Sequence, residues 1–168
     1  MESVEKRMER LTKLLKTGDK KAVLEKACME KVLEGLGDAI PARRLGLTDD
    51  EKEFLKELHL LTMKPVLYIT NVAESEVADP SGNVHVQAVT KYAAEEGAEV
   101  IIVSAKMESE IAELDDESAK EFLEMAGLTE TGLDRLIKAG FKLLGLQTYI
   151  TAGEIEVRAW TITKGTKA

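Results

Sequence analysis

The sequence predicts an α/β fold, because two strand-like runs flank one helical segment. Residues 66–70 and 99–103 are mainly apolar runs rich in β-branched side chains, a pattern typical of buried parallel strands. Residues 84–96 are expected to form a helix that ends at Gly97. Since a strand, a helix and a strand follow one another with no hairpin turn, we expect a βαβ unit.

Residues 1–62 are expected to form an antiparallel α-helical hairpin with coiled-coil-like packing. Apolar residues recur there at helical spacing among charged ones, and the repeat is too short for a long coiled coil. We interpret Gly18-Asp19 as a break between helical stretches. Thr48 and Glu51 form a capping-box pattern, which predicts a further helix running to Leu61.

Two more helices and a β-hairpin are expected after the βαβ unit. Asp115 or Asp116 should cap the first helix, and Thr129 should cap the second. From residue 146 the pattern changes to strands on either side of a turn at 152–153, which indicates a hairpin that begins a β-rich domain. Trp160 alternates with charged neighbours and is interpreted as a core residue of this hairpin.

Composition limits the functional classes. The 168 residues are 44% hydrophobic and 32% charged, so the chain is able to bury a core. A formal net charge of −8 argues weakly against phosphate-backbone binding by the whole surface. Arg43-Arg44 could contact RNA, but we interpret the pair as a solvated face. A single cysteine, Cys28, and no membrane-length apolar run predict a soluble cytoplasmic protein with no membrane partner.

The candidate site lies where the two predicted strands end. In open α/β sheets, ligands bind at the carboxyl ends of parallel strands. In P-loop GTPases, an Asn-Lys-x-Asp segment follows the first such strand and Ser-Ala-Lys follows the second. Here the second segment matches and the first is altered. The predicted base-binding residues are Asn71, Val72, Ala73, Glu74, Ser104, Ala105 and Lys106.

The altered segment favours adenine over guanine. Guanine offers two donors, N1–H and the exocyclic N2–H, that an aspartate carboxylate accepts together. In this chain the aspartate position holds Glu74, which is one methylene longer, and the lysine position holds Val72. Val72 could pack on a base face, while its backbone and the Asn71 amide would remain free for the base edge. We therefore expect adenine or relaxed specificity.

Longer runs resemble the Obg-like ATPase (YchF) family over essentially the whole chain. They include the approach to the altered segment at 60–72, the run at 111–114, and the stretch 133–167 with its Thr151-Ala152-Gly153 motif. The start, with Val4-Glu5-Lys6-Arg7, resembles the helical insertion of that family. The resemblance implies a partial P-loop NTPase nucleotide domain at 63–145, an α-helical hairpin insertion at 1–62, and the start of a TGS domain at 146–168.

The same resemblance implies a ribosome-associated ATPase that prefers ATP to GTP and uses Mg²⁺ in the full-length protein. The chain contains no Gly-x-x-x-x-Gly-Lys-Ser/Thr phosphate loop. We therefore expect an internal fragment that alone neither hydrolyses ATP nor binds it tightly, with no catalytic residues and no metal ligands of its own. His59 and His85 are too few and too scattered for a metal site.

Two alternatives stay open at this point. The chain could belong to a GTP-binding protein of the same superfamily, or it could be a nucleotide-independent module that binds the ribosome or proteins. One consequence concerns folding. Without further parallel strands, the apolar sheet would expose an edge, so self-association is expected.

Overall fold

The structure, a computed structural model, describes residues 1–15 and 19–167. These form two compact units, Met1–Lys64 and Pro65–Ala168, each of which is described by itself. The predicted break at Gly18 lies outside the described residues. Among the described residues, no helix has the length and apolar character needed to cross a membrane.

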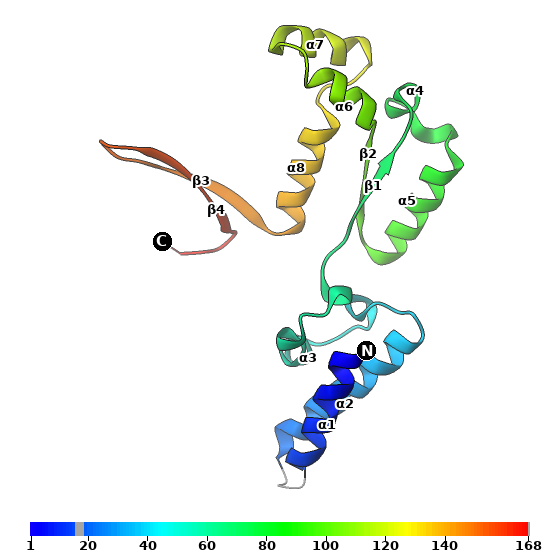
Figure 1. Cartoon of the computed structure of the whole chain (residues 1–168), viewed down its shortest axis with the longest axis vertical. Coiled ribbons are helices and arrows are strands. Elements are labelled where there is room, and N and C mark those ends of the chain that lie inside the picture. Colours follow the sequence, from blue (N-terminus) through cyan, green and yellow to red (C-terminus); the bar gives the residue numbers. More distant parts are fainter. Residues whose placement is uncertain (16–18, 168) are drawn as a thin grey trace. The chain divides into compact units, whose positions relative to one another are not determined.

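In the first unit, helices α1 (Glu2–Leu15) and α2 (Lys20–Gly37) run antiparallel and pack along their length (Figure 1). Both follow the helical spacing of apolar residues that predicted them. Asp19 caps α2, because its carboxylate accepts a hydrogen bond from the backbone N–H of Lys21. The largest fully buried side chains of this unit are Val4, Leu11, Cys28, Met29, Val32 and Leu55.

Helix α3 (Asp49–Leu55) begins where predicted but is shorter than predicted. Thr48 and Glu51 make the full capping box. The expected continuation to Leu61 is wrong: 3-10 turns occupy Lys56–Leu58 and Leu61–Met63, as another does at Ala42–Arg44. His59 between the later two has a φ of +46°, a left-handed conformation that no α-helix can accommodate.

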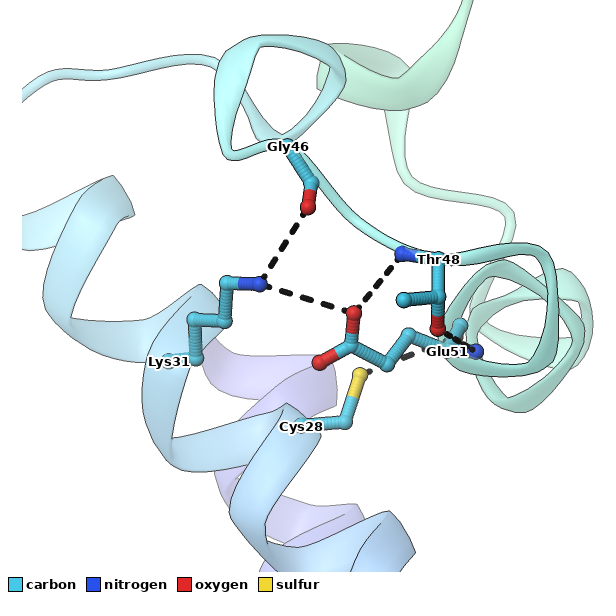
Figure 2. A network of polar contacts seen from close by, with 5 residues as sticks. All are labelled: Cys28, Lys31, Gly46, Thr48 and Glu51. Atoms are coloured by element: carbon cyan, nitrogen blue, oxygen red, sulfur yellow. Dashed lines mark hydrogen bonds and ion pairs between the residues drawn. The ribbon is translucent and has the colours of Figure 1, made fainter.

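A polar network ties α2 to the turn before α3, as Figure 2 shows. Lys31 donates to the carbonyl of Gly46 at 3.4 Å and pairs with the Glu51 carboxylate at 3.5 Å. The Cys28 thiol lies 3.6 Å from the carbonyl oxygen of Glu51. Burial, with the nearby charge of Glu51, raises the pKa of the Cys28 thiol to about 11. Cys28 is therefore a packed core residue.

The second unit is built on the predicted βαβ arrangement. Strands β1 (Leu67–Asn71) and β2 (Glu99–Val103) pair in parallel, with Asn71 opposite Val103, and α5 (Val84–Glu96) connects them (Figure 1). The helix and the second strand have the predicted bounds, and the first strand begins and ends one residue later than predicted. A short helix, α4 (Glu74–Val77), and a 3-10 turn at Pro80–Gly82 follow β1.

Three helices follow β2: α6 (Ala105–Ile111), α7 (Asp116–Met125) and α8 (Gly132–Leu143). Asp115 caps α7, in agreement with the sequence. The expected cap at Thr129 is wrong, because Thr131 accepts the hydrogen bond from the Asp134 N–H and α8 starts after it.

The hairpin consists of β3 (Leu146–Ala152) and β4 (Val157–Thr163), which pair antiparallel. Almost all of its side chains are exposed. The interpretation of Trp160 as a core residue is wrong, because this side chain is 42% exposed. Arg158 stacks on its ring at 5.4 Å, and its indole N–H donates to the Thr151 hydroxyl at 2.9 Å. The alternating pattern predicted one buried face, whereas residues on both faces of this hairpin are exposed.

Candidate functional site

The parallel pairing of β1 and β2 brings the two predicted segments to one edge of the sheet. Asn71 and Val103 are paired in register, so the residues after each strand leave the sheet side by side. The Val72 N–H extends this pairing, because it donates to the Val103 carbonyl at 2.8 Å. The segments 71–74 and 104–106, which are far apart in sequence, are therefore neighbours.

Asn71 links the two segments directly. Its Oδ1 accepts a hydrogen bond from the backbone N–H of Ala105 at 2.9 Å. This donor fixes the amide orientation, since only the oxygen of the amide is able to accept. Asn71 Nδ2 therefore points away from Ala105, and it has no hydrogen-bond partner among the described residues. The site thus presents one amide donor at the strand ends.

Val72 is more deeply buried than the sequence indicated. Its side chain is 9% exposed and packs with Val77 and Val86 in the small core of this unit. The expectation that its backbone is free is wrong for the N–H group, which is bonded to Val103. Only a small part of the Val72 side chain faces the hollow between the segments.

Ala73 is fixed by residues that the sequence analysis did not single out. Its N–H donates to the Glu76 carboxylate at 3.2 Å, and the Asn83 amide donates to the other oxygen of that carboxylate at 3.1 Å. Asn83 also caps α5 by accepting from two backbone N–H groups. The sequence indicated the role of Asn83 as a helix cap, because an asparagine often precedes a helical run, but it did not indicate the contacts of Glu76.

Glu74 and Lys106 form an ion pair across the site. Lys106 Nζ lies 2.7 Å from Glu74 Oε1 and 3.6 Å from the Glu110 carboxylate. Contact with Glu74 is the main cause that raises the pKa of Lys106, and the charge of Glu110 adds to it. Glu74 Oε1 is buried and accepts no hydrogen bond of good geometry, so the ion pair is the interaction that meets its charge.

Ser104 and the elements beneath it hold the second segment. Ser104 is 2% exposed and caps α6 through a hydrogen bond from the Met107 N–H to its hydroxyl at 3.4 Å. Arg135 of α8 donates to the carbonyl of Ile102 at 3.0 Å, and Ile102 lies two residues before Ser104. The sequence gave no sign of this contact, because α8 lies about 30 residues further along the chain.

Residues of the two segments line an open hollow of about 400 Å³. Six of the seven predicted site residues line it, and the seventh, Ala105, contributes its N–H to Asn71. Ser75 also lines it and was not predicted. Among residues 1–15 and 19–167 there is no group of three or more His, Cys, Asp or Glu side chains that could hold a metal ion.

A βαβ unit with a hollow at the carboxyl ends of its strands is the arrangement in which open α/β sheets bind ligands, and it assigns this unit to the α/β class of proteins. No family model matches the chain. It is 56% identical over 168 residues to the ribosome-binding ATPase YchF of Bacillus subtilis, and 47% identical to that of Haemophilus influenzae. It superposes on the YchF GTPase of Schizosaccharomyces pombe with a TM-score of 0.84 and 32% identity over 99% of the chain.

The chain therefore belongs to the YchF family, a branch of the P-loop GTPases. All 168 residues match the B. subtilis relative but span only 46% of its length, and the share is the same for the S. pombe structure. The chain thus spans about half the length of the relatives it matches.

Proposed function

We propose that this chain is the base-recognition half of a ribosome-associated nucleoside-triphosphatase that prefers ATP to GTP. The observation that carries the proposal is the Asn71–Ala105 hydrogen bond, which joins the two strand ends and leaves Asn71, a residue that lines the hollow, with an amide nitrogen that has no partner among the described residues. The relatives are named ribosome-binding ATPases, which supports the ribosome as partner and the cytoplasm as location.

Asn71 is the residue proposed to select a purine. Its Nδ2 donor would meet a ring-nitrogen acceptor such as N7, in the way that asparagine amides contact adenine elsewhere. Ser75, Ser104 and the stem of Lys106 would flank the base, with the exposed edge of Val72 against its face.

Hydrolysis and magnesium binding are proposed for the whole protein, with this chain contributing to neither. A phosphate site needs a cradle of N–H groups with a lysine, and no such motif occurs in the 168 residues. The described residues also contain no cluster able to hold Mg²⁺. We further propose that residues 1–62 are the helical insertion, 63–145 part of the nucleotide domain, and 146–168 the start of a TGS domain.

The test is an NMR titration of the ¹⁵N-labelled chain with ATP and with GTP at millimolar concentrations. We expect ATP to shift the amide signals of Val72, Ala73 and Ala105, and GTP to shift them less at equal concentration. Asn71→Ala should abolish the shifts. Gln147→Ala, which removes an exposed amide on β3, is the matched control and should leave them unchanged. Shifts that are equal for wild type and Asn71→Ala would refute the proposal.

A second candidate function is a nucleotide-independent contact with the ribosome through the β3–β4 hairpin. The observation in its favour is the exposure of large apolar side chains on this hairpin, including Ile150 at 67% and Val157 at 72%. Co-sedimentation of the chain with ribosomes, with and without ATP, separates the two functions. Binding that is lost in Ile150→Asp and indifferent to ATP supports this second candidate.

A further inference from the structure

We propose that the Lys106–Glu74 ion pair is the specificity determinant of this site, because it withholds the Glu74 carboxylate from guanine. The inference rests on the proposed function and deepens it. It assigns discrimination between the two purines to a charged contact between the strand ends, in addition to the length of the glutamate side chain.

The Glu74 carboxylate is held by its contact with Lys106. Nζ approaches Oε1 at 2.7 Å, and Oε1 is buried, so this oxygen faces the lysine instead of the hollow. Glu110 lies one helical turn from Lys106 and pairs with it at 3.6 Å, which keeps the ammonium group near the site. Both Glu74 and Lys106 line the hollow, so a bound base would meet the pair.

Guanine recognition by a carboxylate needs both oxygens at once. N1–H and N2–H are adjacent donors, and a carboxylate accepts from both only when each of its oxygens is accessible to the base. Here Oε1 is buried against Lys106 Nζ and therefore offers a base no accessible surface. The N–H of Ala105, one of the donors at this edge that could contact the guanine O6 acceptor, donates to Asn71. Adenine N1 is itself an acceptor and cannot donate to a carboxylate. The ion pair should therefore not lower the affinity for adenine.

The experiment compares ATP and GTP binding to variants of the full chain by the same NMR titration. Lys106→Met removes the charge and keeps the length of the side chain, so it frees Glu74. We expect the affinity for GTP relative to ATP to rise about tenfold, the effect of one hydrogen bond to a charged group. Lys106→Arg keeps the ion pair and should keep the wild-type ratio.

A matched control exists in the same unit. Lys138 of α8 pairs with Glu130, and the side-chain exposures of that pair, 71% and 32%, resemble the 73% and 37% of Lys106 and Glu74. Lys138→Met removes one positive charge without touching the site. It should weaken both nucleotides alike and leave their ratio unchanged.

The double variant Lys106→Met/Glu74→Gln completes the test, because the gain in GTP affinity should disappear with the carboxylate. An unchanged ratio in Lys106→Met overturns the inference, and so does a gain that survives in the double variant. If wild type shows no Asn71-dependent binding, the proposed function fails as well. If wild type binds ATP through Asn71 and only the ratio fails to move, the ion-pair inference alone is wrong.

Discussion

Glu108 of α6 holds the first turn of α8 at Gly132. Its Oε1 accepts the Gly132 N–H at 2.7 Å, and its Oε2 accepts the next N–H, from Leu133, at 3.1 Å. A β-carbon at position 132 would lie 2.8 Å from Glu108 Oε1 and 2.8 Å from Val103 Cγ1. The helix that follows the second site segment is thus joined to α8 at a point where a side chain has no room.

Gly132→Ala should therefore destabilise the second unit by about 1–3 kcal/mol, the usual cost of overpacking. Gly140→Ala in the same helix is the control, because a β-carbon there meets nothing within 4 Å. It should instead stabilise by about 0.5–1 kcal/mol through higher helix propensity. Urea unfolding followed by circular dichroism measures both changes. Changes of the same sign would show that Glu108 yields to the added methyl group.

The capping box of α3 should make the first unit sensitive to acid. The pKa of Glu51 is lowered from 4.5, chiefly by the hydrogen bond from the Thr48 N–H. Its contribution is complete above the unfolded pKa and is lost as the pH falls through the lower folded pKa. Glu51→Gln should thus be less stable than wild type near neutral pH, and this difference should shrink in acid.

Urea midpoints between about pH 7 and pH 3 measure that difference. Asp50→Asn is the charge control, because Asp50 lies in the same turn and has no ion pair among the described residues. A Glu51→Gln difference that stays constant over this range would contradict the expected role of the carboxylate.

Cys28 should be unreactive in the folded chain. The thiol is 1% exposed, and a pKa of about 11 leaves about a hundredfold less thiolate than the ordinary value of 9.0 does. Reaction with Ellman's reagent should then follow the opening of the first unit and accelerate with urea. Full labelling within the mixing time in native buffer would contradict the packing of α2 against α3.

The open sheet should cause concentration-dependent self-association. Among the described residues β1 pairs only with β2, and Ile69 in β1 is 52% exposed. Sedimentation velocity should show species larger than the monomer, and Ile69→Lys should reduce them. Ile150→Lys, at a position on the hairpin that is 67% exposed, is the control that separates sheet-edge contact from hairpin contact. A single sharp monomer peak over the whole concentration range would contradict the expectation.

A helix with a recognisable capping residue at its start and a terminating residue at its end was predictable from sequence. Residues 84–96 form the expected helix because Asn83 caps its start and Gly97, with a φ of +67°, ends it. Elements whose ends depend on distant residues were not. Thr129 and Thr131 are chemically equivalent caps, and the choice of Thr131 is completed by Glu108, which lies 24 residues from Gly132.

The sequence predicted which residues gather at the strand ends, but it did not predict their hydrogen bonds and ion pairs. The register of a parallel pair brings the ends of both strands together, so the seven residues could be named from two patterns. The sequence did not indicate that the Val72 and Ala73 N–H groups are already bonded, or that Lys106 pairs with Glu74. The contacts of the Ala73 N–H and of Lys106 depend on side-chain directions that a linear pattern does not encode.

Because a crossover connects β1 to β2, the number of residues between Asn71 and Ala105 does not determine the distance between them in the folded protein. Residues inserted at the far end of the sheet, between Gly97 and Glu99, would lengthen a loop and leave Asn71 opposite Val103. A single residue inserted within either strand would reverse the faces of all residues that follow it and break the Asn71–Ala105 bond. Length variation should thus be tolerated in the loop before β2 and should disrupt the site when it falls within a strand. The loop before β2 is therefore the position at which a reporter peptide should be inserted.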